Sequence, residues 1–348
     1  GFFRYTVDPA WDTPHFEKML YDNAQLIGIY LSAAEVFHRP AYQQVALDTL
    51  DFVIETMSGP NGGYFASLSA VDNHNIEGGY YLWQVDELKS ILAADELEIV
   101  SLIWGVKGSP DLEAGFHLKF INTADDVAQQ LKLPPGDVHK KLEQARNKLL
   151  QARQQRQIPI DDKVIAAWNG LLLTSMSKAV IKTGEKRYRQ AATGLYQLLV
   201  NQLWDGHQLF RFKHDGKAAG RVSLEDYAYV SQGIVAWARA SADKQAWETA
   251  RKIALAGLKR FHKNSGWQLS EELVIPYEAR ELVLSDHTMP SPSATLLSVL
   301  YSIAEHQQDD KLRQQILQYV DVDLSVTKSS PLWYGSHILL IHQVLKKS

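Results

Sequence analysis

The sequence predicts an all-α fold in which helical hairpins close into a toroid, with β-hairpin and loop excursions at one rim. The first observation is residues 27–37, which are apolar nearly all round a helix and therefore need protein on both sides. The second is residues 40–57, whose apolar positions occupy one face only, as in an outer helix packed on an inner one. The third is a unit of inner helix, outer helix and extended excursion that recurs at intervals of roughly 60 residues from Asp161 onward.

Inner helices that are apolar all round favour closure, because an open solenoid would leave one inner face exposed. About six inner helices are counted if the first hairpin is completed upstream of Gly1. The prediction is therefore an (α/α)6 six-hairpin barrel that forms a single domain over residues 1–348.

The opening stretch, residues 1–37, predicts a helix that starts at His15. Thr13 suits the N-cap because its hydroxyl accepts a free N–H of the first turn, and Pro14 suits the first helical position. A helix N-terminus favours negative charge, and polar residues gather there. These residues are His15, Glu17, Lys18, Tyr21 and Asp22.

The middle of the chain is less regular. Residues 59–84 are rich in Gly and Asn and predict a β-hairpin or an ordered loop. Residues 85–105 predict one helix, and residues 106–124 an irregular segment. Residues 135–156 are strongly charged with a narrow apolar seam, which predicts a solvent-facing helix.

The second half repeats the opening design. Residues 161–184 have acidic residues at the start, an apolar body and Gly184 as a left-handed C-cap. Their outer partner follows, and residues 207–222 predict a hairpin with an Asp-Gly turn. Residues 223–241 predict a third inner helix, and residues 265–290 an extended polar segment. Two further segments, 291–306 and 310–320, predict a fourth hairpin, before a final helix within 331–347.

Composition excludes several classes of function. The formal net charge of −4 gives no support for nucleic-acid binding or for docking to a membrane surface. The absence of cysteine excludes disulfides, thiol nucleophiles and cysteine-ligated zinc. No apolar run reaches the length of a membrane span and no signal peptide opens the chain, so we expect a cytoplasmic protein. The start at Gly1 without Met leads us to expect more protein upstream.

Five motifs occur in an order that resembles a known family. They are FFRYTVDPAWDTPHFEKMLYDNAQL, EGGYYLW, DDKVIAAWNGLL, SLEDYA and MPSPSATLL. The chain resembles the thioredoxin-domain-containing family known as DUF255, the family of spermatogenesis-associated protein 20 and the bacterial YyaL-like proteins. The resemblance implies a thioredoxin-like domain followed by a six-hairpin barrel similar to glycosidases and N-acylglucosamine 2-epimerases. This chain would be most of that barrel, without the thioredoxin-like domain, its redox motif and the first barrel helices. It departs from the family at Pro292 and Ser293, which replace the usual Gly-Asn.

Carbohydrate enzymes of this fold place paired carboxylates at the excursion rim, because glycoside hydrolysis needs one protonated and one ionised carboxyl group. Asp162 and Asp226 are the predicted acid/base pair, chosen from several acidic residues near inner-helix starts. The others considered are Asp8, Glu17, Asp161 and Glu225. A structural interpretation stays open for all of them, since acidic residues favour the helix dipole and Ser223 with Asp226 is spaced like a capping box.

Other residue types complete the predicted site. His15 suits a general acid or base, or equally a buried structural histidine, and an epimerase would need it together with His287. Arg4 and Lys18 suit an anionic group, but we favour internal pairing. The predicted catalytic residues are Asp162, Asp226, His15 and Glu17. The predicted substrate-binding residues are Arg4, Tyr21, Asp22, Trp168, Asn169, Glu225, Tyr227 and His287.

The resulting hypothesis is a carbohydrate-active barrel, hydrolase or isomerase, that takes a small sugar. No metal or organic cofactor is expected, because the group Asp72, His74 and Glu77 matches no defined metal site and predicts a polar loop. The alternative is a catalytically silent scaffold or sugar-binding module for the upstream thioredoxin-like domain.

Overall fold

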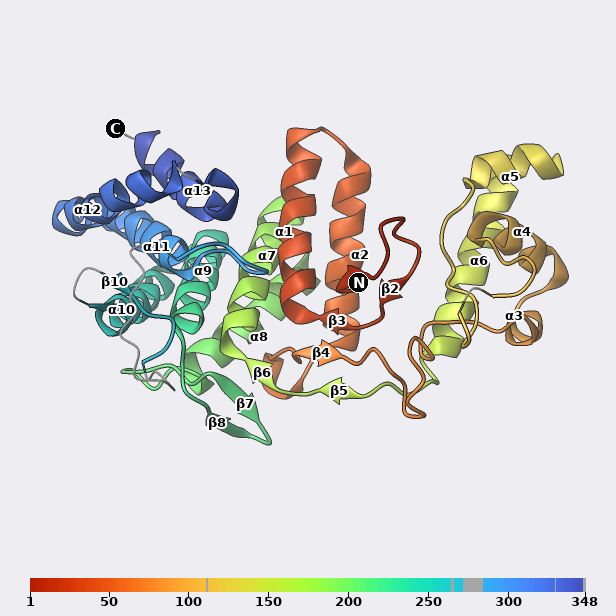
Figure 1. The fold of residues 1–348 in the computed structure, drawn as a ribbon, viewed down its shortest axis with the longest axis horizontal. Helices are drawn as coiled ribbons and strands as arrows, with labels where there is room; N and C mark the ends of the chain where they lie inside the picture. The colour runs from red at the N-terminus through yellow and green to blue at the C-terminus, as the bar shows by residue number, and fades with distance from the viewer. Residues whose placement is uncertain (111, 264–265, 272–283, 329, 347–348) are drawn as a thin grey trace. The chain divides into compact units, whose positions relative to one another are not determined.

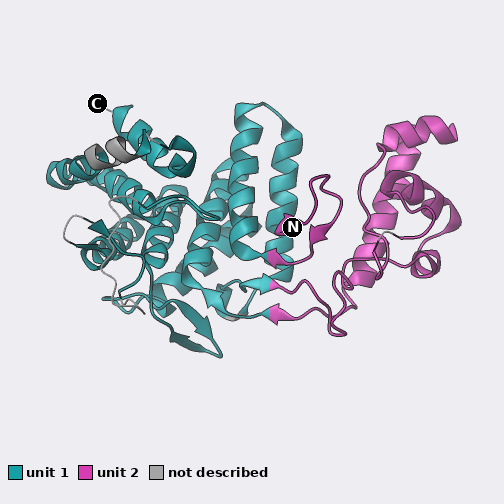
Figure 2. Cartoon of the chain, viewed as in Figure 1, with its two compact units in different colours: residues 1–2, 19–67, 161–348 teal, residues 3–18, 68–160 magenta. Residues whose placement is uncertain are grey.

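The computed structural model describes residues 1–110, 112–263, 266–271, 284–328 and 330–346, apart from the side chains of residues 60 and 321–326. The chain forms two compact units, each assembled from separate stretches of sequence (Figure 2). Unit 1 consists of residues 1–2, 19–67 and 161–348, and unit 2 of residues 3–18 and 68–160. The prediction of a single domain stays a prediction, because compactness does not establish whether a unit folds independently.

Unit 1 is a series of helical hairpins, as the sequence predicts (Figure 1). Its inner helices are α1 (Leu20–Val36), α7 (Ala166–Thr183), α9 (Leu224–Ser241), α11 (Pro292–Gln307) and α13 (Gly335–Leu345). Its outer helices are α2 (Pro40–Thr56), α8 (Lys186–Gln202), α10 (Lys244–Phe261) and α12 (Asp310–Thr327). Each inner helix packs on the next one along the series, and each outer helix packs on the inner helix before it. Short 3-10 turns lie at Pro60–Gly62 and Pro331–Trp333.

The burial of the helices follows their predicted roles in the middle of the series. Helices α7 and α9 bury residues on all sides, whereas α8 and α10 bury mainly one face. The prediction fails for α1 and its C-cap, where Ile29, Val36 and Phe37 are exposed. An apolar pattern reports that a face is suited to burial but does not identify the element that covers it.

Short strands connect the hairpins. In unit 1, β6 (Val164–Ile165), β7 (Phe212–His214) and β8 (Lys217–Ala219) form an antiparallel sheet, and β9 (His262–Lys263) pairs with β10 (Gly266–Trp267). The predicted Asp-Gly hairpin is thus confirmed as β7–β8. In unit 2, β1 (Tyr5–Thr6) pairs with β2 (Pro14–His15). Three strands lie where the chain passes between the units, namely β3 (Lys18–Met19), β4 (Ser67–Leu68) and β5 (Ile160–Asp161).

A repeated hydrogen bond places the excursions of unit 1 at the starts of the inner helices. In three hairpins, the first residue of the inner helix donates its N–H to the excursion that follows its own outer helix. The donor and acceptor pairs are Leu20 to Ala66, Ala166 to Arg211 and Leu224 to Leu269, at 2.8–3.0 Å. The side chains that precede and begin the inner helices therefore lie next to the excursions, as predicted for one rim.

Two predicted helix starts are wrong, and for the same reason. The first helix begins at Leu20 and not at His15, because Pro14 and His15 pair with β1. Helix α7 begins at Ala166, after the strand β6, so Asp161 and Asp162 precede it and do not occupy its first turn. In both places strand pairing takes precedence over a local capping signal.

Unit 2 contains α3 (Val85–Ile91), α4 (Ala94–Trp104), α5 (Ala124–Leu131) and α6 (Pro135–Arg153). The single helix predicted over residues 85–105 is in fact two, because Leu92 is extended and Glu96 caps the second helix by accepting the N–H of Ala93. Helix α6 is solvent-facing with three buried residues, as predicted. An apolar core around Trp83, Val100 and Ile103 holds the four helices together.

The extended segment predicted over residues 265–290 is described only in part. Residues 264–265 and 272–283 lie outside the described residues, and 284–290 contain neither helix nor strand. Among the helices that the structure describes, none has the length and apolarity that a membrane crossing needs.

Candidate functional site

The candidate site lies in unit 1, at the starts of α7 and α9. Asp226 is the third residue of α9 and is fully buried. Its Oδ2 accepts the N–H of Ser223 at 2.8 Å and the Ser223 hydroxyl at 3.1 Å, so the predicted capping box is confirmed. Its Oδ1 accepts the N–H of Ala167 at 3.2 Å, and Arg211 Nη1 lies 3.6 Å from Oδ2. One carboxyl group therefore joins the starts of two neighbouring inner helices.

Burial dominates the acidity of Asp226. It raises the pKa of this carboxyl group to about 6, although the hydrogen bonds from Ser223 and Ala167 and the charge of Arg211 favour the ionised form. The group thus changes its charge in the mildly acidic range. Because both of its carboxyl oxygens accept hydrogen bonds from the protein, Asp226 holds the two helix starts together.

Glu225 is the more accessible carboxyl group. It is half-buried, and burial raises its pKa, while the positive charges of Arg211 and His287 lower it. Unlike Asp226, it accepts no hydrogen bond from any residue that the structure describes. A carboxyl group in this state is suited to exchange a proton with a bound molecule.

Aromatic and basic side chains also lie near the starts of the inner helices. The rings of Tyr21 on α1 and Trp168 on α7 meet edge to face with centroids 4.9 Å apart. Tyr21 is buried, whereas Trp168 remains partly exposed and presents a flat apolar surface. His287 is exposed, with Nε2 at 3.2 Å from Ser285 Oγ. These residues offer a stacking surface and hydrogen-bond donors in addition to the carboxyl group of Glu225.

Two predicted binding residues have a structural role. The amide of Asn169 is buried and its Oδ1 accepts the N–H of Tyr64 at 3.0 Å, while Nδ2 donates to the carbonyls of Tyr64 and Ile165. The buried hydroxyl of Tyr227 accepts the N–H of Leu209 at 3.2 Å. Each side chain thus clamps the excursion of the preceding hairpin, and contact with a substrate stays a prediction.

Asn23 was missed by the sequence analysis, although it forms the same clamp. Its side chain accepts the N–H of Phe2 at 2.7 Å and donates to the carbonyls of Phe2 and Met19. The signal was present, because Asn23 and Asn169 are both the fourth residue of an inner helix. Aligning the two inner-helix starts would have identified it.

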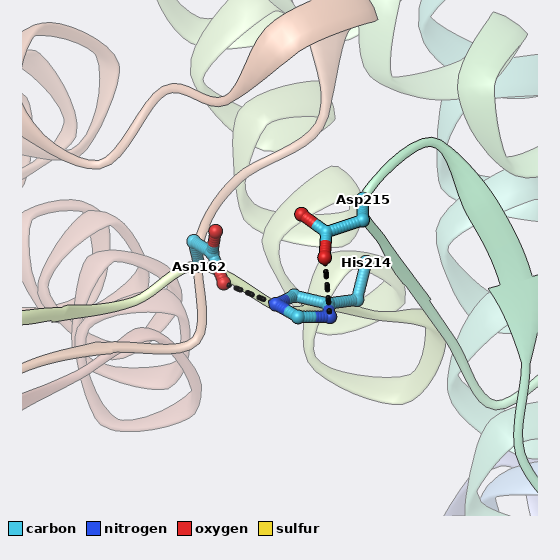
Figure 3. A group of neighbouring side chains, drawn as sticks. All are labelled: Asp162, His214 and Asp215. Atoms are coloured by element: carbon cyan, nitrogen blue, oxygen red, sulfur yellow. Dashed lines mark ion pairs between the residues drawn. The ribbon is translucent and has the colours of Figure 1, made fainter.

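Asp162, between β5 and β6, forms a separate cluster with His214 and Asp215 of the β7–β8 hairpin (Figure 3). Its Oδ1 is 3.0 Å from His214 Nε2, and Asp215 Oδ2 is 3.6 Å from His214 Nδ1. A histidine with two carboxylates can bind a divalent metal, and the three ligand atoms lie within 4.8 Å of one another. All three residues are exposed, and the carboxylates face opposite ring nitrogens, so the geometry suits an ion-pair cluster better than a metal site. Asp162 and Asp226 thus have different ionic partners.

The predicted polar loop around Asp72 is organised by that residue. Asp72 Oδ1 accepts the N–H groups of His74 and Ile76 at 2.8 and 3.0 Å. Among the described residues, the side chains of Asp72, His74 and Glu77 do not bring three ligand atoms together. Asp72 therefore shapes a turn.

The remaining predicted residues belong to unit 2, except Asp22, which begins α1 and has a partner within the protein. Arg4 Nη1 pairs with Glu17 Oε2 at 3.0 Å, and His15 Nδ1 lies 3.9 Å from the same oxygen. The ring of His15 also stacks on Tyr5. The pairing agrees with the internal neutralisation that we favoured for Arg4.

Lys18 is the most perturbed base of unit 2. It is buried, and its Nζ lies 4.6 Å from the centroid of the Phe3 ring and 4.9 Å from that of Tyr81. Burial, with a smaller effect from the charge of Arg153, lowers the pKa of Lys18 to about 7. No sequence pattern indicated this, because the burial depends on aromatic residues far away in the chain.

Comparison with known proteins identifies homologues and confirms the fold. No family model matches the chain. Human spermatogenesis-associated protein 20 is 30% identical over 302 residues, which cover 76% of this chain and 38% of that protein. An uncharacterized Caenorhabditis elegans protein is 25% identical over 346 residues, covering 88% of this chain and 47% of that protein. The chain is thus homologous to these proteins and spans less than half of their length.

Among solved structures, cellobiose 2-epimerase from Spirochaeta thermophila is similar with a TM-score of 0.54. The match covers 92% of this chain and 61% of that chain at 10% sequence identity. At this identity the likeness shows the fold alone. The chain has the predicted all-α fold of the (α/α)6 six-hairpin class.

Proposed function

We propose that the chain acts on a carbohydrate at the inner-helix starts of unit 1, with Glu225 as the group that transfers a proton. The observation that carries the proposal is Glu225 itself, a half-buried carboxyl group with a raised pKa and no hydrogen bond from a described residue. The fold shared with a cellobiose 2-epimerase supports a sugar as the substrate.

Side chains at the inner-helix starts of unit 1 suit the recognition of a sugar ring. Trp168 offers a partly exposed aromatic face, on which the apolar face of a pyranose stacks. Arg211 and His287 are close enough to act electrostatically on Glu225 and supply donors for hydroxyl or carbonyl oxygens. Asp226 contributes indirectly, because it holds the start of α7 against the start of α9.

The state of the carboxyl groups favours epimerisation or isomerisation over hydrolysis. Glycosidases of both stereochemical classes generally need two reacting carboxyl groups. Here Asp226 is occupied by protein donors, and Asp162 pairs with His214. Isomerisation of the open-chain sugar needs one group that removes the proton from carbon 2 and returns it to carbon 1, whereas epimerisation needs a second group that delivers a proton to the opposite face of carbon 2. Glu225 meets that requirement, and His287 is the second candidate.

Deuterium exchange tests this proposal. The chain is incubated in D2O with reducing sugars such as cellobiose, glucose and mannose, and proton NMR follows the C2–H signal. We expect deuterium at carbon 2 of an epimer or at carbon 1 of a ketose isomer, and a loss of about 100-fold or more in the Glu225→Gln variant. Glu35→Gln is the matched control, because Glu35 is an exposed glutamate of α1.

Several outcomes would overturn it. If no sugar exchanges deuterium, or if Glu225→Gln exchanges at the wild-type rate, Glu225 is not the proton carrier. A large loss in Asp162→Asn with no loss in Glu225→Gln would instead support the pair Asp162 and Asp226 that the sequence predicts. His15 and Glu17 enter the same comparison as His15→Gln and Glu17→Gln.

A second candidate function is a catalytically silent scaffold or sugar-binding module that works with a thioredoxin-like domain. The observation that favours it is the structural use of Asp226, Asn169 and Tyr227, whose polar atoms all bind protein groups. It predicts sugar binding without deuterium exchange in any variant. The matches cover less than half of each relative, so the rest of those proteins is long enough to contain the partner domain that the family resemblance implies.

A further inference from the structure

Unit 2 contains a cavity of about 1080 Å³, which is at the upper end of the range for small-molecule sites. Four segments line it, and all of them belong to unit 2: residues 7–16, 72–87, 112–114 and 155–157. Two of the segments carry motifs that the sequence analysis singled out, the opening stretch and EGGYYLW at residues 77–83. The reaction proposed for unit 1 involves neither of these two motifs.

The frame of the cavity is fixed by one arginine. Arg156 Nη1 donates to the carbonyls of Tyr80 and Leu82 at 2.9 and 2.7 Å, and Nη2 donates to Glu87 Oε1 at 2.6 Å. Its guanidinium also lies 4.0 Å from the centroid of the Trp83 ring. Glu87 thus neutralises the positive charge of Arg156, and the N–H groups of Arg156 bond to the protein.

A second group of contacts fixes the loop of residues 72–78, which also lines the cavity. Asp72 is occupied by the turn that it shapes, and Asn73 Nδ2 donates to Gln157 Oε1 at 2.7 Å. Gly78 has a φ of +71°, and a Cβ added there would lie 2.8 Å from atoms of Phe16 and Leu82. These contacts define the backbone that presents Glu77 and Tyr80 to the cavity.

Several other polar side chains of the lining have no hydrogen-bond or ion-pair partner among the described residues. They include His74 and Asn75 and, in the segments that we use below, two carboxylates, two amides and a phenol, namely Glu77, Glu113, Gln84, Gln155 and Tyr80. Amides and a phenol donate and accept, and the carboxylates accept, so together they suit a ligand with many hydroxyl groups. The unpaired formal charges among these five are negative, which disfavours phosphates and sugar acids. The rings of Tyr80 and Phe16 add apolar surface for a pyranose face.

We propose that this cavity of unit 2 binds an uncharged saccharide, with Glu77, Glu113 and Tyr80 as the groups that hold its hydroxyls. The claim concerns binding only and does not depend on the reaction proposed for unit 1. If no sugar is turned over, the saccharide still binds in unit 2; if the cavity stays empty, the proton transfer at Glu225 is unaffected.

Methyl NMR of the full chain tests the site directly. Ile76 and Leu112 line the cavity, whereas Ile181 is an exposed residue of α7 and serves as the control signal. Titration with cellobiose, maltose and lactose is expected to shift the Ile76 and Leu112 methyl signals saturably for at least one sugar, and to leave Ile181 unchanged. Glucosamine and glucuronic acid, tested in parallel, report on cationic and anionic ligands.

Conservative variants separate recognition from folding. Glu113→Gln and Tyr80→Phe each remove one hydrogen-bonding function and keep the shape, so each is expected to weaken binding about five- to tenfold. Glu143→Gln on α6 is the matched control, because Glu143 is exposed and does not line the cavity. The proposal is overturned if the cavity methyl signals respond to none of the neutral sugars. Tighter binding of glucosamine or glucuronic acid, or unchanged affinity in both variants, would overturn it as well.

Discussion

Single side chains explain how the inner-helix starts of unit 1 keep their positions. Asn169 is buried, and its amide bonds both backbone groups of Tyr64, a residue of the preceding hairpin. Asn23 repeats this arrangement with Phe2, and Tyr227 achieves a similar bond through its hydroxyl. The fourth residue of an inner helix is therefore a structural position in this protein.

Replacing the clamp is expected to destabilise the fold. Asn169→Ala leaves the N–H and C=O of Tyr64 buried without a partner, so we expect the free energy of unfolding to fall by about 2–4 kcal/mol. Urea unfolding measures the change. Asn201→Ala, at an exposed position of α8, is the control and is expected to change stability by less than about 0.5 kcal/mol. Equal effects of the two substitutions would contradict the clamp.

Asp226 is expected to make stability depend on pH. Its pKa in the folded state, about 6, lies above the ordinary value of 3.8, so the folded state binds more protons than the unfolded state between these values. The stabilisation is complete below about pH 4 and is lost as the pH rises through about 6. Relative to Asp226→Asn, the free energy of unfolding of the wild type should thus fall by roughly 1–3 kcal/mol from pH 4 to pH 7. A difference that stays constant or grows with pH would show that the carboxyl group is not protonated in this range.

The candidate site was predictable from sequence only where local spacing decides the contact. The capping box of Ser223 and Asp226 is such a case. The bond from Asp226 to Ala167 is not, since it joins residues 59 positions apart. The same limit explains why Glu225 was predicted as a binding residue and not as the proton carrier that we propose, because burial and the charge of Arg211 come from tertiary packing.

At the scale of elements, helical periodicity predicted the hairpins well but not their boundaries. The predicted starts at His15 and Asp161 failed because short strands, which leave almost no sequence signal, occupy those positions. The helix predicted over residues 85–105 failed at Leu92, where the Glu96 cap starts a new helix. Helical periodicity shows which face of a helix is apolar, but it does not show where strand pairing replaces the helix.

The close approach of α7 and α9 rests on two glycines. A Cβ on Gly170 would lie 2.5 Å from the carbonyl of Tyr229, and a Cβ on Gly233 would lie 2.5 Å from the carbonyl oxygen of Gly170. Both distances are well below van der Waals contact, and backbone atoms cannot move aside cheaply. The helices that carry Trp168 and Glu225 are therefore positioned by the absence of side chains.

Gly170→Ala is expected to destabilise the protein by about 1–3 kcal/mol, although alanine is the better helix former. Thermal or urea unfolding measures the loss. Gly194→Ala on α8 is the matched control, because its Cβ would meet only Gly62 Cα at an ordinary 3.7 Å, and it should be neutral or stabilising by up to about 1 kcal/mol. If Gly170→Ala proved as stable as Gly194→Ala, the helices would not need this contact.

For the whole molecule, the repeat of hairpins was enough to predict the six-hairpin class. An error of a few residues in one helix boundary does not change the number or order of the hairpins. The division into two units was not predicted. Unit 2 is made of two stretches that lie apart in the sequence, and their association depends on contacts between residues 3–18 and 68–160. Local periodicity contains no information about such contacts.

The predicted single domain has a measurable consequence. Neither unit is a continuous piece of chain, so each depends on stretches that enter from the other, and we expect one cooperative unfolding transition. Hydrogen exchange in increasing urea, read at amides of α6 in unit 2 and α9 in unit 1, should give coincident midpoints. Two separated midpoints would show that the units fold as separate domains.

The most direct test of the central claim is an experimental structure of the Glu225→Gln variant with the sugar that exchanges deuterium fastest in the wild type. The account predicts a sugar ring against the exposed face of Trp168, with its reacting carbon next to the side chain at position 225. A sugar found only elsewhere, including only in the cavity of unit 2, would contradict the proposed reaction site.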